Sequence, residues 1–347
     1  MRIALVAPSR SDPAHRRVLA SLRERLVALG DEVSVFPPER GPVPREPRLA
    51  LERLLRERGI QICHVQYFSR GFGWLARLRR PPGTRLVLTH QGASFELMER
   101  PAAFRRLARR ADVLTSVSRA GLGELRAFFA GTRAVFRHIP NGTDLGPGRG
   151  RPRAIPRKCR LGGLGRGPFI LSVGRLSAYK GTDILLMAFA RLAAEEPGLE
   201  LAVCGPDQAG GRLARFAARL GLGRRVRFLG DTRPARVREL LARCLFFVLP
   251  SRRENMPMAL LEAMAAGKAV IASDVGGVAE AMRHRVEGLL VEPEDVPALA
   301  GAMRRLARDA RLRTRLGRAA RLRARLYDWS LVALSYRRLY ARVLSAG

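Results

Sequence analysis

Apolar runs of strand length alternate with longer segments of helical periodicity through most of this 347-residue chain. Residues 2–8 (RIALVAP) and 62–68 (ICHVQYF) are short and apolar on both faces, whereas residues 14–29 repeat leucine and valine every three or four positions. Further strands are expected at residues 32–36, 85–92, 112–118 and 134–142. Strands that are apolar on both faces and separated by helices predict a parallel, doubly wound α/β sheet.

The alternation stops at residues 146–167, which are rich in glycine and proline, and then begins again. Such a restart predicts two doubly wound domains, each long enough to bury a core. We expect a first domain at 1–150, a linker at 151–167, a second domain at 168–326, and a C-terminal helix at 327–347 that packs back toward the first domain. Second-domain strands are expected at 168–174, 199–205, 225–230, 244–250, 268–273 and 288–293, with Thr182 capping a helix and a helical region at 296–326.

The formal net charge is +34, and all but three of the 64 basic residues are arginine. Such a surplus attracts anionic lipid headgroups, nucleotides or acidic glycans. Aromatic residues make up only 6% of the chain and no RNA-binding motif is present, so we expect no specific nucleic-acid partner. The basic stretch 100–112, with Phe104, Leu107 and Ala108 on one side, is either a membrane-docking segment or a solvated arginine face.

No N-terminal signal is visible, and no run of about 18 apolar residues predicts a membrane-spanning helix. Cys63, Cys159, Cys204 and Cys244 are scattered, without metal-type or disulfide-type spacing. We therefore expect reduced thiols and a cytoplasmic location, with peripheral association at the inner face of the membrane as an option.

Two glutamates flank a strand-to-helix turn in the second half. Glu254 follows the apolar run CLFFVLPS, and Glu262 lies within a helix expected from Pro257, in its first turn, to Gly267. Carboxylates accept hydrogen bonds from sugar hydroxyls, and a helix N-terminus favours phosphate. This spacing predicts a nucleotide-sugar site in one crevice.

Two cations, Arg175 and Lys180, flank another strand-to-helix turn. Placed there, they can neutralise a diphosphate leaving group; the alternative is a solvated surface pair. Gly276 and Gly277 follow the strand at 268–273, where glycine allows the backbone to approach an anion, although a plain tight turn fits equally.

Taken together, these segments resemble the retaining GT-B glycosyltransferases with the two-glutamate motif, family four, group 1. The matching segments are 172–181, 201–205, 227–231, 246–280 and 288–295, with looser matches at 89–95, 112–120 and 139–145. The resemblance implies two Rossmann-like domains that face each other across a cleft. The chain departs from the family in its first loop, APSRSDPAHRR, which lacks the usual glycine pair, so we assign no phosphate binding to this loop.

The resemblance also implies roles for individual residues. It places Glu254 against the donor sugar, Glu262 on the ribose hydroxyls, and His90 near the sugar from the first domain. The expected catalytic set is Glu254, Arg175, Lys180 and His90, and the expected donor-binding set is Glu262, Asn255, Met256, Pro257, Met258, Gly276 and Gly277. At 255–257 this chain has Asn-Met-Pro where the family often has Gly-Phe-Gly, which leaves the donor sugar open.

The implied activity is transfer of a hexose-type sugar from a nucleoside-diphosphate sugar, UDP before GDP-mannose, to a glycan or lipid-linked acceptor in surface polysaccharide or glycolipid synthesis. No Asp-x-Asp motif follows a strand, so we expect no cofactor and no obligatory metal. The alternatives are a nucleotide-sugar epimerase or phosphorylase-like enzyme of the same fold, and a non-catalytic basic protein that binds glycan or nucleic acid. The sequence does not indicate an oligomeric state.

Overall fold

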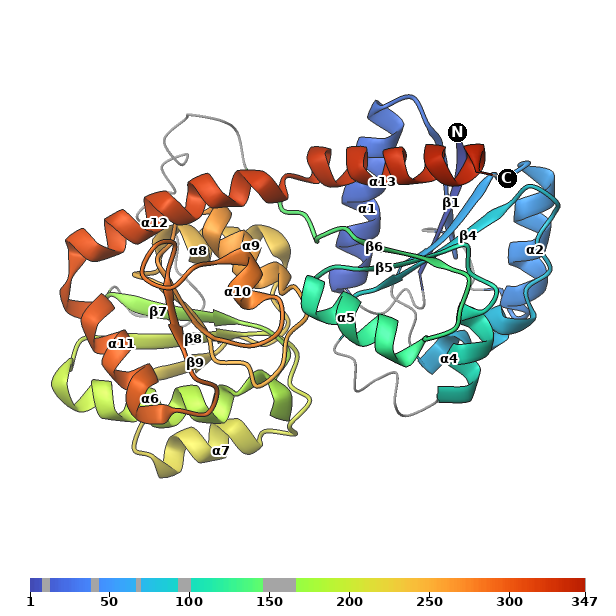
Figure 1. The fold of residues 1–347 in the computed structure, drawn as a ribbon. Helices are drawn as coiled ribbons and strands as arrows, with labels where there is room; N and C mark the ends of the chain where they lie inside the picture. The colour runs from blue at the N-terminus through green and yellow to red at the C-terminus, as the bar shows by residue number, and fades with distance from the viewer. Residues whose placement is uncertain (8–12, 39–43, 67–69, 93–100, 146–166, 347) are drawn as a thin grey trace. The chain divides into compact units, whose positions relative to one another are not determined.

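The structure, a computed structural model, describes residues 1–7, 13–38, 44–66, 70–92, 101–145 and 167–346 (Figure 1). It divides into two compact units, Met1–Gly142 with Tyr327–Gly347, and Thr143–Leu326. Each unit contains one parallel six-stranded sheet, which confirms the predicted doubly wound α/β fold. Of the expected linker at 151–167, all but residue 167 lies outside the described residues, as do Cys159 and residues 8–12 of the first loop.

The first unit has the strand order β2-β1-β3-β4-β5-β6. Its strands are β1 (Arg2–Val6), β2 (Glu32–Phe36), β3 (Ile62–Gln66), β4 (Arg85–His90), β5 (Val113–Ser116) and β6 (Val135–His138). Its helices are α1 (Pro13–Ala28), α2 (Pro47–Glu57), α4 (Pro101–Ala108), α5 (Arg119–Phe128) and α13 (Trp329–Ser345), with a 3-10 segment at Arg70–Arg77. Helix α13 lies beside α1, so the C-terminal segment completes the N-terminal unit (Figure 1).

One polar cluster interrupts the buried strands of this unit. His64 Nδ1 lies 2.5 Å from the Tyr340 hydroxyl, and its Nε2 lies 2.6 Å from Thr89 Oγ1. The Tyr336 hydroxyl is 3.2 Å from the same Thr89 oxygen. The cluster therefore ties α13 to strands β3 and β4 by hydrogen bonds that water does not reach, and every group facing His64 in it is uncharged.

This burial makes the stability of the first unit depend on pH. Burial lowers the pKa of His64 to about 3, whereas in the unfolded chain it is near 6.5. Below about pH 6.5, His64 therefore binds a proton in the unfolded chain but not in the folded unit. Its contribution to the stability of the fold is complete above pH 6.5 and decreases as the pH falls. Between pH 6.5 and 5 the unfolding free energy should fall by about 1–2 kcal/mol more in the wild type than in His64→Asn.

Both tryptophans, Trp74 and Trp329, belong to this unit, so urea unfolding followed by their fluorescence measures the effect. Equal pH slopes for the two proteins would show that folding does not shift the pKa of His64.

Two of the three apolar residues predicted on one side of the basic stretch at 100–112 do not face solvent. Leu107 and Ala108 are buried in the core, and Arg110 donates to the carbonyls of Ala76 and Leu78. The apolar half of the membrane-docking interpretation is therefore wrong for these two residues, because α4 turns them toward the sheet. Side chains of residues 100–104 lie outside the described set.

The second unit has the strand order β12-β11-β10-β7-β8-β9. Its strands are β7 (Phe169–Val173), β8 (Glu200–Cys204), β9 (Val226–Phe228), β10 (Phe247–Leu249), β11 (Val270–Ser273) and β12 (Leu289–Val291). Its helices are α6 (Thr182–Glu195), α7 (Arg212–Arg219), α8 (Pro234–Arg243), α9 (Met258–Ala265), α10 (Val278–Ala281), α11 (Val296–Arg308) and α12 (Ala310–Ala324), with 3-10 segments at Ala178–Lys180 and, reaching into the first unit, Arg325–Tyr327. Helices cover both faces of the sheet (Figure 1).

Two helix starts differ from expectation. Thr182 is the first residue of α6 and does not cap it, because Gly181 occupies the N-cap with a φ of 64°. Pro257 occupies the N-cap of α9, one position before the first helical turn in which it was expected. Within 296–326, Asp309 separates α11 from α12, and its side chain accepts a hydrogen bond from the Leu312 amide at 2.7 Å.

In the part of the chain that the structure describes, no helix combines the length and the hydropathy that crossing a bilayer requires. Cys63, Cys204 and Cys244 are buried free thiols, and burial raises the pKa of each above its ordinary value.

Candidate active site

The strand order of the second unit places two turns side by side. From β7 the chain runs to β8 and β9 at one edge of the sheet and then returns to β10, on the other side of β7. The carboxyl ends of β7 and β10 therefore lie at the topological switch point, where ligands bind in open α/β sheets. The turn after β7 carries Arg175 and Lys180, and the turn after β10 carries Glu254.

The structure joins Lys180 and Glu254, which are 74 positions apart in the chain. Lys180 Nζ donates to Glu254 Oε1 at 2.6 Å, and Ser251 Oγ donates to the same oxygen at 2.7 Å. The side chains are only 18% and 7% exposed. A carboxylate this buried needs a cationic partner, and Lys180 provides one.

Two glycines allow these turns to approach more closely than other residues could. Gly181 has a φ of 64°, and a Cβ there would lie 1.9 Å from the Pro250 carbonyl oxygen. Gly276 has a φ of 51°, and a Cβ there would lie 1.8 Å from the Glu254 carbonyl oxygen. Backbone packing of this kind fixes the turns after β7, β10 and β11 against one another.

Arg252 links the turn after β10 to the segment after β7. Its guanidinium donates to both carboxylate oxygens of Asp183, at 2.9 and 2.7 Å, and to the Ala178 carbonyl at 2.6 Å. Burial alone would raise the pKa of Asp183, but the hydrogen bonds and charge of Arg252 outweigh it and hold the pKa below its ordinary value. A planar guanidinium suits this bidentate contact. In the sequence, Arg252 is one of two adjacent arginines, and no pattern predicts its contact with Asp183.

Arg175 also stands at this edge, together with a residue that sequence reasoning missed. The Arg175 guanidinium carbon is 5.9 Å from the centre of the Tyr179 ring, and Lys180 Nζ is 5.4 Å from it. Both distances fall within the range in which an aromatic face attracts a cation. Tyr179 therefore holds the two cations near the face of one ring. In the sequence, only its position next to Lys180, in SAYKG, could have pointed to this role.

The other donor-binding candidates lie on the neighbouring turns. Glu262 is half-buried on α9, on the side opposite the fully buried Leu260 and Met264. The side chains of Asn255 and Met256 are buried, so this turn can offer a ligand its backbone rather than these side chains. Pro257 is the N-cap of α9 and Met258 is its first residue. The amides of Leu260 and Leu261 donate to the Pro257 carbonyl, at 3.2 and 3.4 Å, so the amides of Met258 and Ala259 are the ones without a carbonyl partner within the helix.

Gly276 and Gly277 offer two further backbone donors. Neither amide donates a hydrogen bond to another described group, and both lie where the turn after β11 meets Glu254. Adjacent amides of this kind form a concavity suited to an anion.

His90 is the one predicted site residue that belongs to the first unit. It ends β4, opposite Ser116 on β5, and is 2% exposed. Burial lowers its pKa to about 4, so the imidazole is neutral at pH 7. A contact between His90 and a donor sugar stays a prediction.

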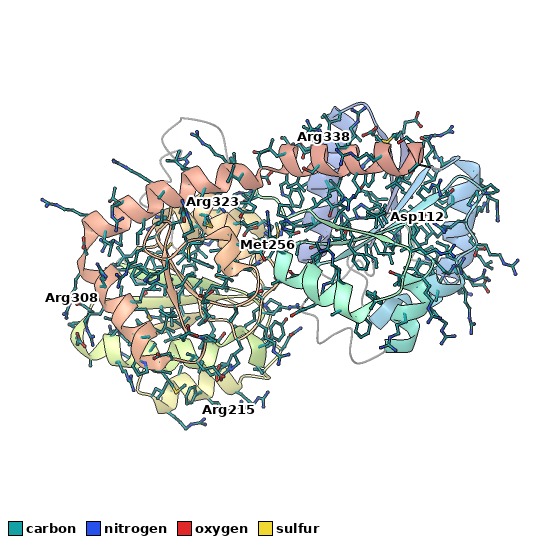
Figure 2. All side chains as sticks on the ribbon, in the orientation of Figure 1. Asp112, Arg215, Met256, Arg308, Arg323 and Arg338 are labelled. Atoms are coloured by element: carbon teal, nitrogen blue, oxygen red, sulfur yellow. The ribbon has the colours of Figure 1, made fainter. Side chains whose placement is uncertain are left out.

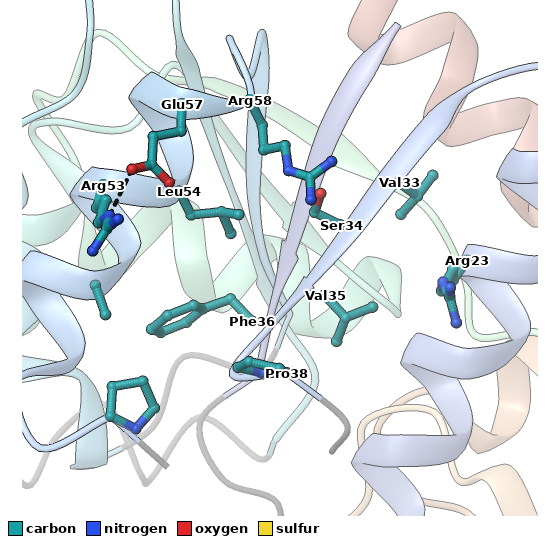
Figure 3. Close-up of a pocket in the computed structure, with 12 residues that line it drawn as sticks. Arg23, Val33, Ser34, Val35, Phe36, Pro38, Arg53, Leu54, Glu57 and Arg58 are labelled. Carbon is teal, nitrogen blue, oxygen red and sulfur yellow. Dashed lines mark hydrogen bonds and ion pairs between the residues drawn. The ribbon is translucent and has the colours of Figure 1, made fainter. Parts of the chain in front are cut away.

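A cavity of about 480 Å³ opens elsewhere, along edge strand β2 of the first unit (Figure 3). It is lined by Val33, Val35 and Leu54 and by arginines, of which Arg53 is paired with Glu57 at 2.6 Å. None of the predicted site residues lines it. Among the described residues, no three histidine, cysteine or acidic side chains gather as metal ligands would.

Comparison with known proteins identifies the family. The family model described as "Glycosyltransferase Family 4" matches residues 2–146, and the model "Glycosyl transferases group 1" matches residues 162–323. A D-inositol 3-phosphate glycosyltransferase of Corynebacterium jeikeium is 30% identical over 315 residues, which cover 84% of this chain and 75% of its own. A protein of the same name from Nocardia farcinica is 29% identical over 270 residues, which cover 72% of this chain and only 59% of its own.

Solved structures share the whole architecture. Sucrose-phosphate synthase from Thermosynechococcus elongatus matches with a TM-score of 0.82 at 24% identity, over all of both chains. HepE from Anabaena, in complex with UDP-glucose, matches with a TM-score of 0.81 at 21% identity, also over all of both chains. These likenesses confirm the GT-B fold that the sequence predicts.

Proposed function

Because this chain belongs to glycosyltransferase family 4, group 1, we propose that it transfers a hexose-type sugar from a nucleoside-diphosphate donor to a glycan or lipid-linked acceptor, with retention of anomeric configuration. The observation that carries the proposal is the contact of Lys180 with Glu254 at the switch point, where Gly276 packs against the backbone of Glu254. The cation and the backbone amides at this place suit the negatively charged diphosphate of a nucleotide sugar. The carboxylate suits the hydroxyls of its sugar.

The Lys180–Glu254 ion pair suggests how donor binding begins. Each side chain compensates the other's charge, so neither is buried alone. A bound diphosphate gives Lys180 a second anionic partner and frees Glu254 oxygens to accept hydrogen bonds from sugar hydroxyls. Tyr179 keeps Arg175 beside Lys180, so both cations face the same leaving group.

In the chemical step, the bond from the anomeric carbon to the diphosphate oxygen breaks and a bond to the acceptor oxygen forms on the same face. The acceptor's proton passes to the departing diphosphate oxygen. Lys180, Arg175 and the amides at 276–277 stabilise the negative charge that develops there. Cations of the protein itself serve this charge, so the proposal includes no metal.

We propose a UDP-sugar as donor, with GDP-mannose second. HepE was solved with UDP-glucose, and its fold is shared along the whole chain. D-inositol 3-phosphate is a second acceptor candidate, because relatives at about 30% identity are named for it and a net charge of +34 favours a phosphorylated acceptor.

Donor screening followed by product analysis tests the proposal. UDP, GDP, ADP and their sugars are added in turn, and the true donor raises the unfolding midpoint by mass action. The sugar-labelled donor is then incubated with lipid-linked, glycan and D-inositol 3-phosphate acceptors. We expect the label on an acceptor with the donor's anomeric configuration; an epimerised donor or a free sugar phosphate would instead support the epimerase or phosphorylase-like alternative.

The ribose assignment predicts a selective loss of affinity. Glu262→Ala should weaken UDP binding about 10- to 100-fold, because hydrogen bonds from ribose hydroxyls to a carboxylate contribute about 1.5–3 kcal/mol. Titration calorimetry measures the affinity. The matched control is 2′,3′-dideoxy-UDP, which should bind the wild type and the variant equally. An equal loss with both nucleotides would place Glu262 away from the ribose.

A further inference from the structure

Helix α12 carries a one-signed charge that the proposed chemistry does not use. Its 15 residues, ARLRTRLGRAARLRA, include six arginines and no acidic residue. The buried side, with Leu312, Leu316 and Ala320, packs on the second unit, where α12 contacts α9 and α11. Four of the six arginines, Arg311, Arg315, Arg318 and Arg321, are exposed on the other side.

The exposed arginines form a stripe rather than a scatter. Arg311, Arg315 and Arg318 are spaced by four and three residues, and Leu322 and Arg325 continue the same spacing. Residues so spaced lie on one face of a helix. At 1.5 Å per residue the helix is about 22 Å long, and long side chains with nitrogen ends stand out along it (Figure 2).

The charge of this stripe is not neutralised locally. On neighbouring α11, Arg304 and Arg308 form ion pairs with Glu195 and Glu196. By contrast Arg311, Arg318, Arg321 and Arg325 form no ion pair within the ranges that the structure describes. Two of the three arginines on α11 are thus compensated by carboxylates, whereas these four arginines at α12 and its C-terminal end are not.

Two leucines project beside the stripe. Leu322, in the last turn of α12, is 59% exposed, and Leu326, four residues later in the 3-10 segment that follows, is 56% exposed. A single exposed leucine is ordinary, but a pair at helical spacing beside uncompensated cations needs an explanation. Basic side chains with adjacent projecting apolar groups are the features of helices that lie in a membrane interface.

We propose that the exposed face of α12 docks the protein on an anionic lipid surface. The arginines would contact phosphate-bearing headgroups, and Leu322 and Leu326 would enter the acyl boundary. A nucleic acid would satisfy the arginines but leave the leucines in water, so the lipid surface fits more of what is exposed. This surface differs from the basic stretch at 100–112, whose Leu107 and Ala108 are buried.

Sedimentation with vesicles tests this surface. The full chain is mixed with phosphatidylcholine vesicles containing 30% phosphatidylglycerol, and with vesicles of phosphatidylcholine alone. We expect binding to the anionic vesicles only. Arg311→Glu/Arg318→Glu should lower the partition coefficient at least about 25-fold, since each basic residue near an anionic surface contributes about fivefold. Leu322→Ser/Leu326→Ser should lower it about tenfold.

The matched control is Arg212→Glu/Arg219→Glu on α7. Like Arg311→Glu/Arg318→Glu, it replaces two exposed arginines that are seven residues apart on one helix of the second unit, so the two variants have the same net charge. This control should bind the anionic vesicles like the wild type. An equal loss in the α7 control would mean that total charge alone drives binding. If the leucine variant kept full vesicle binding, or if RNA competed and the leucines did not matter, the lipid assignment would be overturned. A donor-induced rise in the unfolding midpoint, tested on every variant, separates this outcome from failure of the proposed function.

Discussion

Lys180→Ala is expected to slow sugar transfer about 30- to 1000-fold, which corresponds to about 2–4 kcal/mol of transition-state stabilisation. Lys180 is the cation that contacts Glu254 directly, and its Nζ is also held near the Tyr179 ring. A fixed ammonium beside a departing diphosphate stabilises its negative charge without reorganisation, and Arg175 and the amides at 276–277 would compensate only part of its loss. Initial rates at saturating donor measure the effect.

The same substitution also removes the partner of a nearly buried carboxylate. Glu254 would retain only the hydrogen bond from Ser251, so a loss of activity could reflect a distorted turn. The double variant Lys180→Ala/Glu254→Gln removes the uncompensated charge and should recover stability lost by the single variant, but none of its activity. Recovery of turnover in the double variant would mean that Lys180 serves only to neutralise Glu254.

Gly276→Ala is expected to lower kcat/KM about 100-fold. A Cβ at this position would lie 1.8 Å from the Glu254 carbonyl oxygen, so one of the two turns must move by more than 1 Å. A displacement of that size at reacting groups costs about two orders of magnitude in rate. Steady-state kinetics on the folded variant gives the value.

The control for Gly276 is Gly221, between α7 and β9. Its φ of 72° is also left-handed, but a Cβ there meets nothing within 4 Å. Gly221→Ala should therefore share the strain of about 1–2 kcal/mol that an alanine suffers in this conformation and keep full activity. If the two variants lost activity equally, backbone strain and not the contact with Glu254 would be responsible.

Local patterns predicted most of the fold because each strand and helix carries its own periodicity. The run CLFFVLP predicted β10, and the alternation of such runs with helices predicted the doubly wound class. Helix boundaries were less predictable. Thr182 is a good capping residue by type, but the close approach of Gly181 to Pro250 moves the start of α6 by one residue, and that contact involves a strand far along the chain.

The contacts among the predicted site residues could not be derived from the sequence. Glu254 and Lys180 could be proposed separately from their turns, yet their ion pair depends on β10 lying beside β7, and this order does not follow the chain. The same adjacency creates the Arg252–Asp183 contact, for which neither residue carried a local signal. Tyr179 shows the same limit, since only the folded turn places its ring beside two cations.

A crystal structure of the full chain with the nucleoside diphosphate that screening selects tests the proposed donor site at the switch point most directly. We predict a diphosphate oxygen within about 2.7–3.2 Å of Lys180 Nζ and of the amides at Gly276 or Gly277, with the ribose hydroxyls on Glu262. A diphosphate bound away from the carboxyl ends of β7 and β10, with the Lys180–Glu254 pair undisturbed, would contradict it.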